Sequence, residues 1–243
     1  MLPLTRPYRK TLPWGKRKMN KHNNELIEVK KDISEIFIEV AENRIDTLAD
    51  FHFVTELPVL KTICTVAKGI VGILNQYQIR MIEQFIYTVN SGIASSGEIH
   101  VHIENLRADR KKLEKEVNYI LVKISAWTDI KKSEYFGKLY IAYISKRIPW
   151  EELTLYTDIL GQITLFDLTT LEELYKIGRY DTHSNPPFAS MLRLQSLGLA
   201  VFHDGYVRQT SRNSNSGQVK EERGRITNEG KMFYRLITSS RII

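Results

Sequence analysis

Residues 57–74 read LPVLKTICTVAKGIVGIL and form the most distinctive stretch of this 243-residue chain. Eighteen mostly apolar residues in a row are long enough to suggest a helix that spans a membrane. On a helical wheel, however, the polar and small residues gather on one side and the apolar residues cover the other. Each of the two lysines near the middle of a bilayer would cost about 2.5–3.5 kcal/mol on the insertion scale. The pattern therefore predicts a helix that is buried on one face in a protein core.

The polar side of this predicted helix is a smooth stripe that a second helix could approach closely. The stripe consists of Lys61, Thr65, Lys68, Gly69 and Gly72. An alternative interpretation is a helix that lies on a membrane surface and perturbs it, and the stripe would then belong to the membrane-binding segment. The core helix is the leading interpretation because the apolar residues cover only half of the wheel.

Helical periodicity of the apolar residues continues on both sides of this segment. It predicts helices over residues 24–48, 76–89, 97–125, 129–144, 149–160 and 167–177. Asp109 marks an expected break in the third of these helices. Thr128 is the expected N-cap of the fourth, and Pro149 is the expected first residue of the fifth. Thr170 and Glu173, three residues apart, resemble a capping box in the sixth.

The character of the sequence changes after residue 178. We expect a polar loop at 178–187, a short helix at 188–197 that stops before Gly198, strands at 199–202 and 225–227, and a final helix at 228–237. Residues 204–224, rich in Ser, Asn, Gly and Arg, would form the wing of a winged helix. The predicted fold is mainly α, with a helical domain at 23–162 followed by a small winged-helix-like α+β module at 163–243.

The net charge of +7 is concentrated at the beginning of the chain. Residues 1–22 contain seven of the 35 basic residues and no acidic residue, so 28 basic and 28 acidic residues remain elsewhere. Three prolines and the lack of any helical or strand period predict disorder in this tail. The tail is either a basic arm that binds phosphates or an artefact of a start site upstream of Met19. Mass spectrometry of the native N-terminus distinguishes the two.

The chain carries no sequence signature of a catalytic or cofactor site. The motifs GxxxxGK[ST], GxGxxG and GxSxG are absent. His100 and His102 point to opposite sides if they lie on a helix, so they cannot share a metal ion there. Cys64 is the only cysteine and cannot form an intramolecular disulfide, which indicates a reducing compartment. We therefore expect a cytoplasmic protein that is not an enzyme and needs no metal or cofactor.

The predicted order of elements raises DNA binding as an alternative. The recognition helix would be 188–197, with Arg193 and Gln195 as base-reading side chains. The wing would add Arg208, Arg212, Lys220 and Arg223, offset by Asp204, Glu221 and Glu222. This set is thin, because specific DNA-binding proteins usually carry a clearer basic face. The leading hypothesis is therefore contact with a partner protein or self-association, and a DNA-binding transcriptional regulator is the runner-up.

Three parts of the chain carry a resemblance to known proteins. They are IDTL, ELPVL and AKGI within residues 45–70, GKLYIAYI and FDL within 137–168, and the ending LxxLGL at 194–199 with ITxxG at 226–230. Together they resemble a group of uncharacterised bacterial proteins and are distantly similar to the abortive-infection alpha proteins of phage defence. The resemblance covers about residues 45–237 and implies a bacterial origin, a helical fold with a winged end, and a role in phage defence or stress response. Its motifs are packing residues and turns, so it transfers no catalytic residue.

Overall fold

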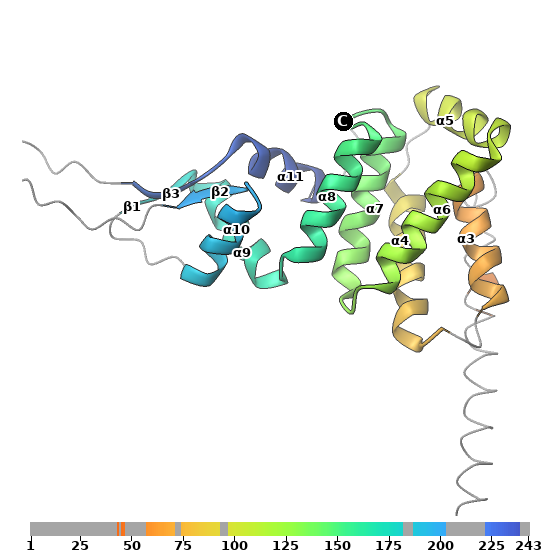
Figure 1. Ribbon diagram of the computed structural model, residues 1–243, viewed down its shortest axis with the longest axis horizontal. Coiled ribbons are helices and arrows are strands. Elements are labelled where there is room, and N and C mark those ends of the chain that lie inside the picture. The colour runs from red at the N-terminus through yellow and green to blue at the C-terminus, as the bar shows by residue number, and fades with distance from the viewer. Residues whose placement is uncertain are drawn as a thin grey trace, which may run out of the picture.

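A computed structural model describes residues 43, 45–46, 57–70, 74–92, 97–181, 187–202 and 222–238. Within these ranges the chain is mainly helical, with nine helices and one three-stranded sheet. The helices are α3 (Pro58–Gly69), α4 (Gln76–Gly92), α5 (Gly97–Ala108), α6 (Arg110–Ser125), α7 (Ile130–Ile144), α8 (Trp150–Gln162), α9 (Leu165–Ile177), α10 (Phe188–Ser196) and α11 (Asn228–Thr238). The strands are β1 (Arg179–Asp181), β2 (Ala200–Phe202) and β3 (Glu222–Ile226). We call α3–α8 the helical body, and α9–α11 with the sheet the C-terminal unit; the two follow each other along the long axis in Figure 1.

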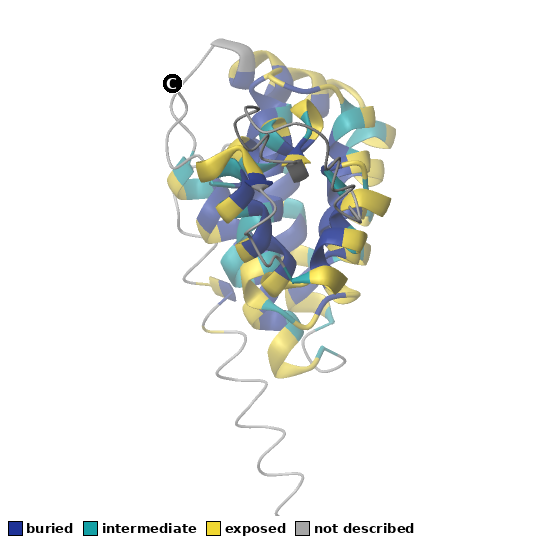
Figure 2. Cartoon of the chain, turned by 90° about the vertical axis from the view of Figure 1, so that its left-hand side faces the viewer, coloured by how far each residue is buried: buried dark blue, intermediate teal, exposed yellow. Residues whose placement is uncertain are grey.

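Helix α7 is the centre of the helical body and packs against α4, α5 and α8. It approaches α4 closely at Gly137, where an added Cβ would lie 2.8 Å from the Cβ of Thr88. Next to this contact, the ring of Phe85 lies 5.1 Å from that of Phe136 and 5.7 Å from that of Tyr140. All three rings are fully buried, and the buried sides of the helices face inward in Figure 2. The helices of the body thus share an apolar core, which continues into the C-terminal unit.

The predicted helix with one buried face is confirmed as α3, although it is shorter than the predicted 57–74. Ile63, Cys64 and Ala67 lie on its buried side, as the wheel predicts. Burial raises the pKa of the Cys64 thiol to about 11, which suits a packed rather than a reactive cysteine. The helix ends at Gly69, and residues 71–73 lie outside the described ranges.

The observed helix boundaries in the body confirm one of the sequence predictions and change two others. The break at Asp109 is confirmed, because this residue caps α6 and accepts a hydrogen bond from a backbone N–H of its first turn. The predicted N-cap Thr128 is wrong, since Asp129 caps α7 and accepts from the N–H of Lys131 at 2.9 Å. Pro149 is the N-cap of α8 rather than its first residue. At α7, Asp129 rather than Thr128 satisfies a backbone donor of the first turn, whereas Pro149 makes no side-chain cap hydrogen bond at α8.

The start of α9 also differs from the prediction. The capping box is formed by Thr164 and Asp167, not by Thr170 and Glu173, so the helix begins two residues earlier than expected. Thr170 lies inside the helix, where its hydroxyl donates to the carbonyl of Phe166. Backbone N–H groups in a helix interior are already bonded, so Thr170 has no free donor to cap.

The sheet contains a strand that the sequence did not predict. β1 lies in the expected polar loop at 178–187, and β3 begins at Glu222, inside the expected wing. The strand order is β1–β3–β2, and both pairs are antiparallel. Strand β1 has the sequence Arg-Tyr-Asp, and its single apolar residue is Tyr180. This side chain is buried, and its hydroxyl donates a hydrogen bond to the carboxylate of Glu173 at 2.8 Å. Such a short strand forms only because β3 is beside it to supply hydrogen-bonding partners.

The predicted helix end at Gly198 is confirmed. This residue has a φ of +73°, which glycine adopts without the steric cost that a Cβ imposes. The final helix, α11, is also confirmed, and it begins close to the start of β2. A Cβ at Gly230 would overlap the carbonyl oxygen of Leu199, so only glycine allows this approach.

Helix α11 also joins the C-terminal unit to the body, because it packs against both α9 and α7. The ring of Phe233 lies 5.7 Å from that of Tyr156 on α8. The hydroxyl of Tyr156 donates to Glu229 at 2.5 Å. The C-terminal unit therefore contacts the body through the packing of α11 on α7 and through an apolar and a polar contact of Tyr156.

Several predictions fall on residues that the structure does not describe. The basic tail at 1–22 with Met19, most of the helix predicted at 24–48, and the wing at 204–221 lie outside the described ranges. These remain sequence-based expectations.

Candidate functional site

Helix α10 is the expected recognition helix, and its two candidate base-reading side chains, Arg193 and Gln195, both form hydrogen bonds within the C-terminal unit. The Nε of Arg193 donates to the buried carboxylate of Asp167 on α9 at 2.7 Å. The side-chain oxygen of Gln195 accepts from the N–H of Phe202 on β2 at 2.8 Å. Both residues therefore connect α10 to its neighbours, and fewer of their polar groups are available to read base edges.

The pairing with Arg193 also sets the ionisation of Asp167. Burial raises the pKa of this carboxyl, but hydrogen bonds from the Thr164 backbone and from Arg193 outweigh burial. The net pKa lies below its usual value, so the carboxylate is charged near neutral pH. The ion pair holds α10 against the start of α9.

The remaining nucleic-acid candidates are not placed by the structure. Arg208, Arg212 and Lys220 lie outside the described residues. Arg223 lies on β3, and only its backbone is described. The wing as a binding element thus stays a prediction.

The predicted docking stripe on α3 faces away from the core. Lys61, Thr65, Lys68 and Gly69 are all exposed, and Gly72 lies outside the described residues. Lys68 forms an ion pair with Asp46. A Cβ added at Gly69 would meet no atom within 4 Å. The small residues of the stripe therefore pack against no other described helix.

A second group of basic residues, which the sequence analysis did not single out, gathers on the outer face of the sheet. Arg179 of β1 lies directly opposite Arg225 of β3, and Val201 of β2 lies opposite Arg225 on its other side. Residues in one such row share a face of the sheet. Gly224, the neighbour of Arg225, faces the other way, because a Cβ there would lie 2.8 Å from the Met191 side chain of α10. The two arginines thus lie on the side of the sheet away from α10.

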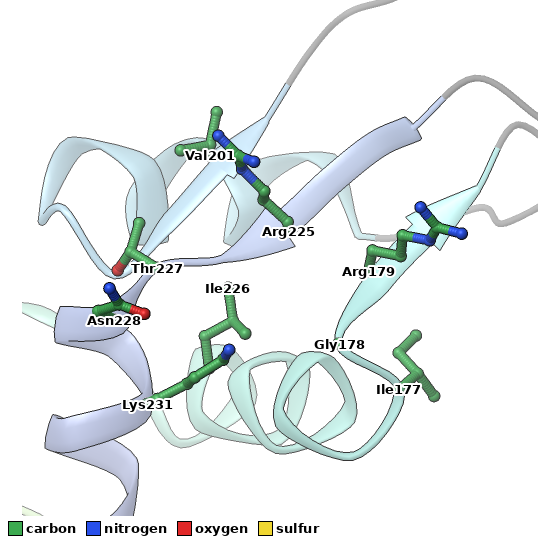
Figure 3. A pocket seen from close by; sticks show the side chains of 9 residues that line it. All are labelled: Ile177, Gly178, Arg179, Val201, Arg225, Ile226, Thr227, Asn228 and Lys231. Carbon is green, nitrogen blue, oxygen red and sulfur yellow. The ribbon is translucent and has the colours of Figure 1, made fainter.

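This outer face is hollowed where it meets α11. A hollow of about 660 Å³ is lined by Arg179, Arg225 and Lys231, together with polar and apolar residues of β2, β3 and the start of α11 (Figure 3). A second hollow of about 570 Å³ shares Lys231 with the first and extends to Arg235. Among the described residues that line the two hollows, none is acidic. We call Arg179, Arg225, Lys231 and Arg235 the basic strip.

Among the described residues, no carboxylate forms an ion pair with Arg179 or Lys231, whereas Arg225 has a further interaction. The Nε of Arg235 donates to the hydroxyl of Tyr175 at 2.9 Å, and its guanidinium lies 5.8 Å from the centre of that ring. The ring of Tyr175 in turn packs at 4.6 Å from that of Tyr234. The strip therefore ends on an aromatic pair.

The helical body contains one buried polar cluster. Glu116 of α6 is only 1% exposed and accepts from the hydroxyls of Tyr140 and Tyr143 of α7 at 2.9 and 2.8 Å. His102 of α5 lies 3.3 Å from the same carboxylate. Burial and the Glu116 charge raise the pKa of Tyr140, so both tyrosines stay protonated donors. The cluster ties three helices together, and His100, two residues before His102, is exposed.

The described part of the chain contains no group of three or more His, Cys, Asp or Glu side chains that could hold a metal ion. In the same part, every helix is too short or too polar to cross a membrane.

Sequence reasoning missed the basic strip for two reasons. Arg179 lay in an expected loop and had no visible relation to Arg225, because the pairing of β1 with β3 brings them together. Lys231 and Arg235 were within reach of prediction, since residues four apart share one side of a helix.

Comparison of the chain with protein-family models, with curated proteins and with solved structures gave no significant match.

Proposed function

We propose that this protein acts through protein–protein contacts and that its C-terminal unit is a winged-helix-like docking module. The order helix, strand, helix, strand, strand, helix supports the winged-helix assignment, as does the small antiparallel sheet next to α10. The contact surface that we assign is the solvent side of α10.

The apolar character of this solvent side carries the proposal. Phe188 is 55% exposed and Leu192 is 45% exposed, and they lie one helical turn apart. A helix that reads DNA bases needs polar groups at these positions. Here the polar side chains nearby, Arg193 and Gln195, are bonded within the unit instead. Exposed apolar side chains beside a polar rim are typical of the centre of a protein interface.

The test is cross-linking of the tagged full-length protein in bacterial cells, followed by mass spectrometry. We expect cross-links from α10 to a partner protein or to a second copy of the chain. The double substitution Phe188→Ser and Leu192→Ser removes both exposed apolar side chains and is expected to abolish these cross-links.

The matched control is the double substitution Val122→Ser and Leu155→Ser, which removes two exposed apolar side chains from α6 and α8 of the body. This variant should keep the cross-links to α10. Cross-links that survive the α10 substitutions, or that disappear equally in both variants, contradict the docking surface.

The biological setting that we propose is phage defence, and the resemblance to abortive-infection alpha proteins is its sole support. Bacteria that express the protein should give fewer phage plaques than bacteria that carry an empty vector. The Phe188→Ser, Leu192→Ser variant should restore plaque numbers if defence acts through α10. Equal plaque numbers with and without the protein, across a broad phage panel, contradict this setting.

A DNA-binding regulator is the second candidate, and the exposure of Arg193 favours it. This side chain is 41% exposed despite its bond to Asp167, so part of the guanidinium lies at the surface. The test is a gel-shift assay on genomic fragments with titrated salt. A preferred sequence whose binding is lost in Arg193→Ala supports a regulator, and binding without sequence preference contradicts one.

A further inference from the structure

We infer that the partner of the α10 surface is a second copy of this chain, and that the two copies pair α10 against α10 around a two-fold axis. This rests on the proposed function and deepens it by naming the partner. The inference is carried by the charge, the shape and the rigidity of the exposed side of α10, which consists of Phe188, Ala189, Leu192, Gln195 and Ser196.

The lack of charge on this side of α10 is the first observation. Its exposed residues lie within about a third of the helix circumference, with Leu192 at the centre. Among the helices that the structure describes, α10 is the only one whose exposed residues include no charged side chain. An uncharged face with Phe188 and Leu192 near its middle suits burial against another protein rather than contact with water.

A face without charge is compatible with its own copy. Around a two-fold axis the same face meets itself, so a charged side chain near the axis would meet its own like charge. The single charged residue of α10, Arg193, lies at the edge of the face. Its charge is balanced by the buried carboxylate of Asp167. Two copies of α10 therefore meet without net repulsion.

The order of large and small side chains along α10 is the second observation. In an antiparallel pair centred on Leu192, the two Leu192 side chains meet at the axis. Phe188 of each copy then lies opposite Ser196 of the other copy, so that a large ring faces a small side chain at both ends. Such alternation of large and small side chains lets two surfaces interdigitate.

The rigidity of the face is the third observation. The ring of Phe188 lies 5.8 Å from that of Phe202 on β2, edge to face. The side-chain oxygen of Gln195 accepts from the backbone N–H of the same Phe202, and the hydroxyl of Ser196 donates to the carbonyl of Arg193. Side chains that are already ordered lose little conformational entropy on binding, which favours association through a small surface.

The test is sedimentation velocity of the full-length chain. A helix of nine residues gives a contact at the small end of interface sizes, so the measurement covers concentrations from about 1 to about 200 µM. We expect a reversible monomer–dimer equilibrium. Leu192→Glu and Leu192→Lys each place two like charges at the axis, and each should weaken dimerisation at least about tenfold. Leu155→Glu and Leu155→Lys, at an exposed leucine of α8, are the matched controls and should dimerise like the wild type.

The decisive measurement mixes the two Leu192 variants in equal amounts. Because the axis brings this position of one copy against the same position of the other, the opposite charges should restore dimers that neither variant forms alone. An equal mixture of the two Leu155 variants should behave like the wild type. A variant that had lost its fold would not be rescued in this way, and circular dichroism checks the helix content of each.

A wild-type chain that stays monomeric over this concentration range overturns the inference, and so do dimers that persist in both Leu192 variants. A mixture that stays monomeric while the wild type dimerises overturns it as well. Cross-links in cells from α10 to a different protein, together with a monomeric chain, contradict the second copy and leave the docking surface standing. A monomeric chain without any cross-link from α10 contradicts both.

Discussion

The helical body and the C-terminal unit hold their elements together by different means. In the body, rings such as Phe85 and Phe136 fill a large core around α7, and one buried carboxylate, Glu116, joins three helices. In the C-terminal unit, the strands are three to five residues long, and α11 touches backbone directly at Gly230.

The C-terminal unit shares the apolar core and adds polar contacts between its elements. Tyr180 bonds to Glu173, and Arg193 bonds to Asp167. Substitutions of buried apolar residues should therefore cost stability in either part, whereas substitutions of these carboxylates should remove single contacts. The unit also presents the proposed contact surface, the apolar solvent side of α10.

The largest effect is expected for Phe85→Ala in the core of the body. This ring has no exposure and lies against Phe136 and Tyr140. Loss of the ring leaves a cavity and should lower the free energy of unfolding by about 3–5 kcal/mol. Urea denaturation monitored by circular dichroism measures the loss. Tyr87→Ala on the exposed side of the same helix is the control and should change stability by less than about 0.5 kcal/mol.

Gly230→Ala should have the next largest effect, and it should be centred on the C-terminal unit. The new Cβ overlaps the carbonyl oxygen of Leu199 and lies 2.9 Å from Ile226. We expect a loss of about 3 kcal/mol, because backbone atoms on either side must shift. Hydrogen exchange should become faster in β2 and β3 than in α4. Equal acceleration in β2, β3 and α4 would contradict an effect centred on Gly230.

Asp167→Asn tests the ion pair between α9 and α10. The variant should lose about 1–2 kcal/mol at pH 7, since a hydrogen bond to a charged group is replaced by one to a neutral amide. The pKa of Asp167 lies below its usual value in the folded protein, so its contribution is present above the unfolded pKa of about 4 and is lost as the pH falls through the folded pKa.

The difference between wild type and Asp167→Asn should therefore narrow as the pH falls below about 4. Urea midpoints of both proteins from neutral to acidic pH measure this. Glu172→Gln removes a carboxylate whose ion pair with Lys176 lies on the surface, and it should change stability by less than about 0.5 kcal/mol. If the difference in stability between the wild type and Asp167→Asn widened in acid, the pKa of Asp167 would be raised rather than lowered in the folded protein.

Gly69→Ala should have the smallest effect and tests the docking stripe on α3. A Cβ here meets no atom within 4 Å, and alanine is the better helix former. The free energy of unfolding should stay the same or rise by up to about 1 kcal/mol. Thermal unfolding measures this change. A clear loss of stability would show that a further segment packs closely on this side of the helix.

The positions of the helices were largely predictable, because the spacing of apolar residues is a local property of the chain. The break at Asp109 and the end at Gly198 also follow from single residues with strong conformational preferences. The caps were less predictable. Thr128 and Asp129 are adjacent and both can cap, and the choice depends on where the following helix meets its neighbours.

The candidate sites were likewise predictable in their position along the chain but not in their contacts. That Arg193 and Gln195 lie on one short helix was predictable, but that they bond to Asp167 and Phe202 was not, because these partners are distant in sequence. The basic strip depends on the pairing of β1 with β3, two short strands about 45 residues apart. β1 has no strand pattern of its own, and the expected strand at 225–227 covered only the end of β3.

The amino-acid sequence by itself determined that this protein is mainly helical, that α3 buries one side, and that a small mixed unit follows the helices. These properties follow from periodicity and from Gly and Asp preferences, which act over a few residues. Only the tertiary structure decided which polar side chains are used for packing and which face the solvent. Which side chains pack and which are exposed depends on contacts between segments that are distant in the sequence. These contacts leave apolar side chains exposed on α10 and basic side chains exposed on the outer face of the sheet.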